Sequence, residues 1–194
     1  MLMPGVRGAI AAAEGPIESK KLEAQILTGV TVGPVFGTQE LSMAMPFHRH
    51  IQDLDHRVWV LQGHTLTMVP KRRNVVPVTV DLYPCQHLET LEKDRGNPMY
   101  LGLKELQSSL FCTKVGEQPE LQLNKRTIDN LYHHPQPEKP FLFYHNQAGN
   151  TSTFESAAFP GWFIGTGSTG ESPVFMTQEV GKTHVTEFVL TTMS

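Results

Sequence analysis

From His56 to the C-terminus, the chain consists of short runs of aliphatic and aromatic residues separated by turn residues. Val58 and Val60 are followed by Gly63 and then by a second apolar run, Leu66–Met68, which is the pattern of a β-hairpin. Similar runs recur through the rest of the chain, without the helical patterns that alternate with strands in α/β proteins. This part of the chain is therefore predicted to form an all-β domain.

Eleven strands are predicted after residue 56, and a twelfth short strand is expected near Glu179. The eleven cover Val58–Val60, Leu66–Met68, Val78–Leu82, Tyr100–Leu103, Leu110–Val115, Leu121–Asn124, Phe141–His145, Ser152–Glu155, Trp162–Gly165, Val174–Thr177 and Glu187–Leu190. One helical segment is predicted at Lys125–Tyr132, where Ile128 and Leu131 share a face. This pattern leaves both a closed barrel and a two-sheet sandwich open.

A coarse internal similarity favours the barrel. Tyr100–Leu103, Phe141–Tyr144 and Trp162–Ile164 each begin with an aromatic residue and lead through a Gly- or Ser-containing turn into another strand. Three units of four strands would close on one another and remove the exposed sheet edges. The sequence therefore favours a β-trefoil of twelve short strands with pseudo-threefold symmetry.

The first 41 residues differ from the rest of the chain. They contain one aromatic residue, Phe36, and glycines interrupt every potential period. Arg7 leads only into the short apolar run Ala9–Ala13, which is not the apolar core of a secretory signal, and several acidic residues argue against a mitochondrial presequence. We expect residues 1–41 to be a disordered extension or propeptide, residues 42–194 to be the folded domain, and synthesis to occur in the cytoplasm.

Charge and hydropathy argue against two classes of partner. The chain has 16 Lys and Arg residues against 19 Asp and Glu, a net charge of −3, and a pI of about 6.3. Nucleic-acid-binding domains are typically basic, and the longest basic run, Lys71–Arg73, is too short to follow a phosphate backbone. Since no apolar stretch approaches the roughly 18 residues of a membrane span, neither nucleic acid nor a membrane is expected as a partner.

Three short motifs resemble functional signatures but lack the context that those signatures require. Gly165, Gly167 and Gly170 match a dinucleotide-binding pattern, but a strand follows them instead of a helix, so a hairpin turn is predicted. Gly181–Thr183 resembles the end of a phosphate-binding loop that lacks its first glycine. Asn150–Ser152 is a glycosylation sequon that matters only in the secretory lumen.

The histidines and cysteines do not form a catalytic or metal-binding pattern. The cluster from His48 to His56, which includes Asp53, has no zinc-site spacing and is interpreted as solvated residues at the start of the first strand. Cys112 alternates with Leu110 as a buried strand residue does, and in the cytosol it and Cys85 are expected to stay thiols. We therefore expect no enzyme activity, no metal and no cofactor.

Several segments resemble the interleukin-36 branch of the interleukin-1 family. They are His56-Arg-Val-Trp-Val-Leu-Gln62, Glu89-Thr-Leu-Glu-Lys-Asp-Arg-Gly-Asn-Pro-Met-Tyr-Leu-Gly-Leu103 and Gly116-Glu-Gln-Pro-Glu-Leu-Gln-Leu123. The most specific match begins at Lys139 and contains Phe141-Leu-Phe-Tyr144, Thr151-Ser-Thr-Phe-Glu-Ser156 and Phe159-Pro-Gly-Trp-Phe-Ile164. The resemblance extends from Ile51 to Ser194.

This resemblance implies a β-trefoil cytokine and not an enzyme. Members of the family are made without a signal peptide, leave cells by an unconventional route and act as extracellular ligands. The resemblance implies a monomeric, pro-inflammatory agonist that binds the interleukin-36 receptor (interleukin-1 receptor-like 2) and then recruits the interleukin-1 receptor accessory protein. Signalling through NF-kappa-B and MAP kinases would follow.

In this family, the loop between the fourth and fifth strands and the loop between the eleventh and twelfth help to engage receptors. By position, the resemblance places the first at Lys104, Glu105, Leu106 and Gln107, and the second at Gly181, Lys182, Thr183 and His184. The related receptor antagonist has a longer insertion in the second loop. The compact segment Glu179–Phe188 therefore favours agonism.

Family members also gain potency when they are trimmed a fixed short distance ahead of an aliphatic-x-Asp motif. Ile51-Gln-Asp53 matches this motif and places the new N-terminus at Ser42. The 41 residues ahead of Ser42 exceed the usual short leader. Two explanations stay open, a long prosegment or translation that starts at Met43 or Met45.

Alternatives from other classes also stay open. A receptor antagonist of the same family would bind without signalling. A heparin- or carbohydrate-binding trefoil would need a ligand patch, for which Lys71–Arg73 is the visible starting point. A trefoil protease inhibitor would need a rigid exposed loop, often braced by a disulfide.

The aromatic residues of the most specific match are expected in the core or at its cap, not at a receptor; they are Phe154, Phe159, Trp162 and Phe163.

Overall fold

The described part of the chain folds into one continuous antiparallel sheet that curls into a barrel with hairpins attached. The computed structural model describes residues 46–89 and 91–193, and these residues contain thirteen strands. The strands are β3 (Phe47–Gln52), β4 (Arg57–Gln62), β5 (Thr65–Pro70), β6 (Val80–Pro84), β7 (Asn97–Leu103), β8 (Ser108–Val115), β9 (Gln118–Asn124), β10 (Leu142–Ala148), β11 (Thr151–Ser156), β12 (Phe163–Gly167), β13 (Ser172–Thr177), β14 (His184–Val185) and β15 (Val189–Thr191).

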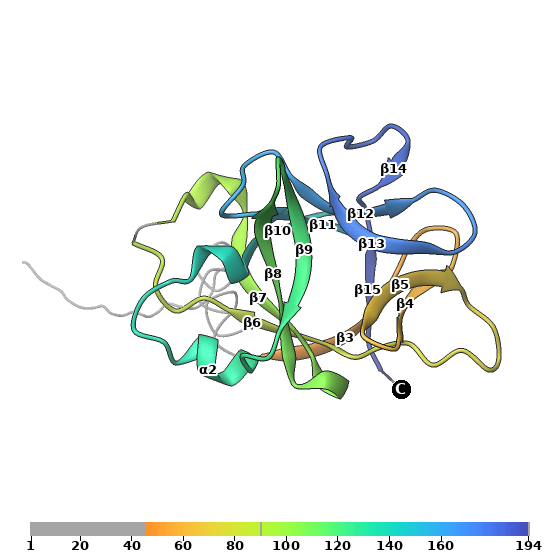
Figure 1. Ribbon diagram of the computed structural model, residues 1–194, viewed down its shortest axis with the longest axis horizontal. Coiled ribbons are helices and arrows are strands. Elements are labelled where there is room, and N and C mark those ends of the chain that lie inside the picture. Colours follow the sequence, from red (N-terminus) through yellow and green to blue (C-terminus); the bar gives the residue numbers. More distant parts are fainter. Residues whose placement is uncertain (1–45, 90, 194) are drawn as a thin grey trace, which may run out of the picture. The chain divides into compact units, whose positions relative to one another are not determined.

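Six strands close the barrel (Figure 1). β3 pairs with β6, β6 with β7, β7 with β10, and β10 with β11. A bridge between Ser152 of β11 and Phe188 leads to β15, which pairs with β3 and completes the ring. Each barrel strand therefore has a neighbour on both sides, which removes the sheet edges on which other chains could pair.

Three hairpins complete a β-trefoil. β4–β5, β8–β9 and β12–β13 each lie between two barrel strands of one unit, so the chain divides into the units β3–β6, β7–β10 and β11–β15. The predicted fold is confirmed, but the aromatic pattern that suggested it is not the repeat. Tyr100 lies in β7, whereas Phe141 and Trp162 precede β10 and β12, and these strands take different positions in their units.

Strand β3 is the main element that the sequence prediction missed. Its sequence has two apolar residues, Phe47 and Ile51, with Arg49 between them, so hydrophobic alternation does not reveal it. It is a strand because residues 47–49 pair with β6 and residues 50–52 pair with β15. The guanidinium of Arg49 lies 5.0 Å from the centre of the Phe47 ring. The predicted short strand near Glu179 is present as β14, which pairs with β12.

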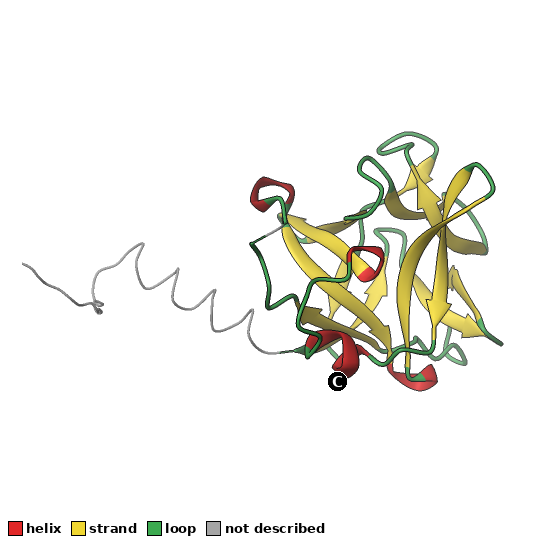
Figure 2. Cartoon of the chain, turned by 60° about the vertical axis from the view of Figure 1, so that its left-hand side comes forward, coloured by secondary structure: helices red, strands yellow, loops and turns green. Residues whose placement is uncertain are grey.

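The helical turns are short and lie between strands (Figure 2). α2 (Ile128–Tyr132) falls in the segment predicted to be helical and buries Ile128 and Leu131, as predicted. It begins after Thr127, whose side-chain oxygen accepts a hydrogen bond from the backbone N–H of Asn130 at 3.2 Å. Single 3-10 turns lie at η3 (Lys93–Arg95) and η4 (Lys104–Leu106), before α2, and at η5 (Lys139–Phe141), after it. Within the described residues, no helix has the length and apolar character needed to cross a membrane.

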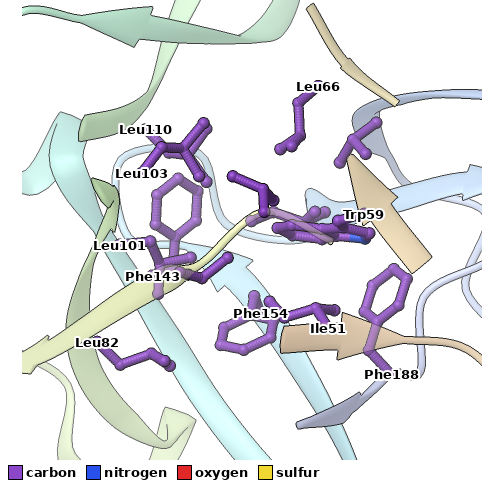
Figure 3. Close-up of a cluster of buried hydrophobic side chains, with 14 of the residues drawn as sticks. Ile51, Trp59, Leu66, Leu82, Leu101, Leu103, Leu110, Phe143, Phe154 and Phe188 are labelled. Carbon is purple, nitrogen blue, oxygen red and sulfur yellow. The ribbon is translucent and has the colours of Figure 1, made fainter. Parts of the chain in front are cut away.

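Large apolar side chains from all three units meet inside the barrel (Figure 3). Ile51, Trp59, Phe143, Phe154 and Phe188 are fully buried, and Trp59 meets Phe188 edge to face with 5.5 Å between ring centres. Edge-to-face pairs are a favourable geometry for aromatic rings. The core therefore rests on aromatic residues that are far apart in the sequence.

The aromatic residues of the family signature do not all lie in this core. Phe154 is fully buried, which confirms its expected core position. Phe159 and Trp162 are half-buried and pack against the core from outside, and Phe163 is also half-buried. Their position at the edge of the core fits the predicted cap role, but Trp59 is the tryptophan at the centre of the molecule.

A buried ion pair closes the turn between β3 and β4. Asp53 and Arg57 are 1% and 4% exposed, and Nε of Arg57 donates to Oδ2 of Asp53 at 2.7 Å. The same guanidinium donates to the carbonyl oxygens of Gly167 at 2.7 Å and Gly170 at 3.2 Å. The pair thus joins the first unit to the β12–β13 hairpin. The interpretation of Asp53 as a solvated residue was wrong, because the sequence does not show its partner on the next strand.

Candidate functional site

The connection between β13 and β14, residues 178–183, is exposed along its whole length and fixed at its base. The hydroxyl of Thr177 accepts a hydrogen bond from the backbone N–H of Glu179 at 2.9 Å and lies 2.6 Å from Nδ1 of His184. The His184 ring also packs edge-on against Phe175, with 4.9 Å between ring centres. Loops held in this way by a rigid scaffold are common positions for binding residues.

Three of the predicted site residues, Gly181, Lys182 and His184, line a hollow of about 360 Å³. The turn between β3 and β4, residues 53–55, also lines it. Leu54 is 60% exposed there, between two aspartates. A single exposed apolar side chain is ordinary on a protein surface, so it is the shared lining of the hollow that brings this turn into the candidate site. Sequence reasoning missed this turn, because its approach to the loop at 181–184 depends on the tertiary fold.

The other predicted segment, Lys104–Gln107, forms the tight turn η4. Lys104 and Gln107 are exposed, and Leu106 is half-buried. The carboxylate of Glu105 has a structural role, because both of its oxygens accept a hydrogen bond from the backbone N–H of Thr79, at 3.1 and 3.2 Å. This carboxylate holds the residue before β6 in place.

Counting β3 changes which loop lies between the fourth and fifth strands. Among the described strands, Lys104–Gln107 connects the fifth, β7, to the sixth, β8. The connection between the fourth and fifth, β6 and β7, is residues 85–96. The strand count made from the sequence was therefore one strand short, because it began after β3, and the receptor contact expected at Lys104–Gln107 stays a prediction. The connection from β13 to β14 does lie between the eleventh and twelfth.

Residues 85–96 cover a second buried cluster outside the barrel. Its members are Cys85, Leu91, Tyr100, Ile128, Leu131, Phe141, Leu142, Tyr144 and Ala157. The outer surface of the loop carries the exposed acidic residues Glu89, Glu92 and Asp94. The loop therefore has an apolar inner side that fixes it and exposed carboxylates on its outer side, of which Glu92 pairs with Arg95 at 3.4 Å.

These segments are not brought together in one site. In Figure 1, residues 85–96 lie at the left of the barrel, β14 lies at the upper right, and the turn at 104–106 lies at the lower edge. The fold thus joins the loop at 181–184 to the β3–β4 turn, but not to Lys104–Gln107.

The predicted processing motif is part of the barrel. Ile51 is fully buried, and Asp53 is held in its ion pair with Arg57. The motif residues therefore have a structural role, and a protease could not bind their side chains in the folded domain. The predicted new N-terminus, Ser42, lies outside the described residues.

Both cysteines are buried free thiols, in agreement with the sequence prediction. Burial raises the pKa of Cys85, and it raises the pKa of Cys112 to about 11 in spite of a hydrogen bond with Ser156. Such thiols are poor nucleophiles at neutral pH. In the part of the chain that the structure describes, no three His, Cys, Asp or Glu side chains gather where they could hold a metal ion.

Comparisons with known proteins agree with this architecture. Residues 78–190 match the family model described as interleukin-1 / 18. Human interleukin-36 alpha is 56% identical over 151 residues, which cover 78% of this chain and 96% of that protein. The chain belongs to the interleukin-1 family. As a member it is a cytokine, an extracellular signalling protein without enzymatic activity.

Two solved structures resemble this chain, one in both sequence and fold and the other in fold alone. The NMR structure of interleukin-36 alpha, named in its own description as a pro-inflammatory cytokine, matches with a TM-score of 0.68 and 55% identity, over 78% of this chain and 96% of that chain. Chicken interleukin-1 beta matches with a TM-score of 0.64 and 23% identity, over 75% of this chain and 96% of that chain. The second match supports the fold alone.

Proposed function

We propose that this cytokine is a pro-inflammatory agonist of the interleukin-36 receptor. The observation that carries the proposal is its 56% identity to human interleukin-36 alpha over nearly the whole of that protein. The ligand binds the receptor first and then recruits the interleukin-1 receptor accessory protein, which activates NF-kappa-B and MAP kinase signalling. It acts as a monomer.

The surface supports a ligand with two partners. The hollow beside Lys182 and the loop at residues 85–96 lie in different parts of the molecule. Two separate interfaces allow one ligand to bridge two receptor chains, and the first complex then forms a composite surface for the second partner. Receptor contacts are proposed at Gly181, Lys182, Thr183 and His184 and in the loop between the fourth and fifth strands, residues 85–96. Lys104, Glu105, Leu106 and Gln107 stay a further candidate segment.

Agonism, as opposed to antagonism, is supported by the compact loop from β13 to β14. Thr177 and His184 hold its two ends together, and Thr183 donates a hydrogen bond to Glu179 across it. This leaves no long insertion between residues 178 and 183 that could obstruct a second receptor chain.

The proposed mature ligand is residues 42–194, made in the cytoplasm and released without a signal peptide after removal of residues 1–41. Its barrel pairing begins at Phe47, close to the proposed terminus at Ser42. A chain that starts at Ser42 therefore keeps every described strand, which supports this terminus for the mature ligand.

The test is a reporter assay in cells with and without the interleukin-36 receptor. Purified protein that starts at Ser42 should activate the reporter only in receptor-positive cells, and an antibody against the accessory protein should abolish the signal. Binding without a signal, together with competition against interleukin-36 alpha, would instead assign an antagonist.

A further inference from the structure

One side chain ties the loop at residues 85–96 to a different unit of the trefoil. Nη2 of Arg95 lies 2.6 Å from Oε2 of Glu155 on β11, and it also donates to the carbonyl oxygen of Ser156 at 3.2 Å. The guanidinium lies 4.5 Å from the centre of the Tyr144 ring on β10. The charged groups of Arg95 and Glu155 are mostly shielded, with side chains only 15% and 14% exposed.

The partner of Arg95 is itself fixed. Oε2 of Glu155 also accepts the backbone N–H of Gly161 at 2.7 Å. Glu155 lies in β11, next to Ser156, whose hydroxyl accepts the backbone N–H of Phe159 at 3.0 Å. The turn after β11 thus holds the carboxylate of Glu155, and Arg95 pairs with a group whose position is fixed.

Other contacts hold the same end of the loop against β10. The backbone N–H of Glu92 donates to the hydroxyl of Tyr144 at 3.1 Å, and the side chain of Asn146 donates to the carbonyl oxygen of Arg95. Gly96 has φ 122°, and a Cβ there would lie 2.8 Å from the carbonyl oxygen of His145. This close approach leaves no room for a side chain, so the backbone sits directly on the strand.

We propose that Arg95 and Glu155 are positioning residues that hold loop 85–96 in the conformation that the receptor complex recognises. The inference rests on the proposed function, and on a receptor contact made by the loop between the fourth and fifth strands. It gives the glutamate of the signature Phe154-Glu-Ser156 a role inside the ligand. Neither Arg95 nor Glu155 needs to touch a receptor for this role.

A charge-assisted hydrogen bond shielded from water is stronger than an exposed ion pair, because solvent screens it less. Loss of this contact should free the loop without opening the barrel, since β6 and β7 pair directly with each other at its base. The expected effect is therefore local.

The experiment uses Arg95→Gln, Glu155→Gln and the graded variant Arg95→Lys. Arg126→Gln is the matched control, because Arg126 also pairs with a glutamate, Glu138, at 2.6 Å and lies over a ring, Phe141, at 5.2 Å. The readouts are amide hydrogen exchange at Leu91 and Glu92, the reporter EC50 and the melting temperature.

In Arg95→Gln and Glu155→Gln, exchange in the loop should become about tenfold faster and the EC50 should rise about tenfold, with little change in melting temperature. In Arg95→Lys, the exchange rate and the EC50 should lie between those of these variants and the wild type. An ammonium keeps the charge but cannot make the several directed hydrogen bonds of the planar guanidinium. Arg126→Gln should alter neither loop exchange nor EC50.

A wild-type level of loop exchange and EC50 in both glutamine variants would overturn the inference. An equal rise of EC50 in Arg126→Gln would also overturn it, because the effect would then be one of general stability. A wild-type protein that gives no receptor-dependent signal contradicts the proposed function, and loop exchange then decides separately whether the pair holds the loop.

Discussion

Asp53 and Arg57 show how a single pair of residues connects two distant parts of this fold. Both side chains are buried, and Arg57 reaches two backbone carbonyls of the β12–β13 hairpin in addition to the carboxylate. Inside a protein, the loss of one member of such a pair leaves the other charge without compensation. The aspartate of the aliphatic-x-Asp motif is thus explained by the fold.

We expect Asp53→Asn to lower the free energy of unfolding by about 3–5 kcal/mol, because Arg57 would stay buried and charged. Urea denaturation followed by fluorescence measures the change. The control is Arg126→Gln, which breaks a more exposed ion pair and should cost about 1 kcal/mol or less. Equal losses in the two variants would mean that burial of the pair is not what matters.

The two tryptophans should differ in their contribution to stability. Trp59 is fully buried in the barrel, whereas Trp162 is half-buried at its edge. Trp59→Ala should therefore cost about 3–5 kcal/mol in urea unfolding, and Trp162→Ala should cost clearly less. If Trp162→Ala proves the more damaging, the assignment of the core centre to Trp59 fails.

His145 should make stability depend on pH. Burial lowers the pKa of His145 below its usual 6.5, and its ring stacks on Phe154 while Nε2 contacts the hydroxyl of Ser152 at 2.8 Å. Below pH 6.5, the unfolded state then binds a proton that the folded state does not, so stability should fall as the pH drops from 6.5 toward the folded pKa.

The comparison of urea unfolding at about pH 7 and pH 5 tests this dependence. His145→Gln should lose less stability on acidification than the wild type, whereas the exposed control His64→Gln should behave like the wild type. An unchanged pH dependence in His145→Gln would contradict the lowered pKa of this half-buried imidazole.

At the level of the elements, the sequence reveals strands whose apolar residues alternate and misses those defined by pairing alone. The β4–β5 hairpin and the α2 segment were predicted from apolar spacing and turn residues. β3 carries His48, Arg49 and His50, and only its partners β6 and β15 make it a strand. Long-range pairing of this kind leaves no local signal. The omission of β3 also shifted the strand count by one, which changes the connection that lies between the fourth and fifth strands.

The candidate site residues were likewise predicted only where the sequence carries a local signal. The loop at 181–184 was found because it is polar and lies between recognisable strands, but the approach of Leu54 to Lys182 depends on the tertiary fold. The hydrogen bond from the backbone N–H of Thr79 to the carboxylate of Glu105 could not be predicted from the sequence either, since the two residues belong to different connections.

Lys182 should affect receptor signalling without affecting the fold. Its side chain is exposed on the loop from β13 to β14. Lys182→Glu should weaken receptor binding by about 1 kcal/mol or more, a roughly fivefold rise in EC50, with an unchanged melting temperature. The matched control is Lys114→Glu, which reverses an exposed charge on the β8–β9 hairpin. The proposed contact is wrong if both variants signal alike.

At the scale of the whole molecule, the trefoil separates stability from signalling. Ring closure through β3 and β15 makes the first and last strands of the barrel depend on each other. The loops that connect the strands can then vary with little cost to the barrel. This explains how the interleukin-1 beta structure, at 23% identity, keeps the same fold.

The position of the N-terminus should matter in two different ways. A chain that starts at Ser42 keeps every described strand and should unfold at the same urea concentration as the full chain, while its EC50 should be lower. A chain that starts at His50 loses the pairing of residues 47–49 with β6 and should be strongly destabilised. A shift in the unfolding midpoint of the Ser42 form would show that residues 1–41 contribute to the stability of the domain.

Sequential binding to purified receptor ectodomains tests the central claim most directly. The interleukin-36 receptor ectodomain is immobilised, the chain starting at Ser42 is added, and the accessory-protein ectodomain follows. We predict that the accessory protein is retained only when both receptor and ligand are present. A folded ligand that is not retained by the receptor would contradict the account.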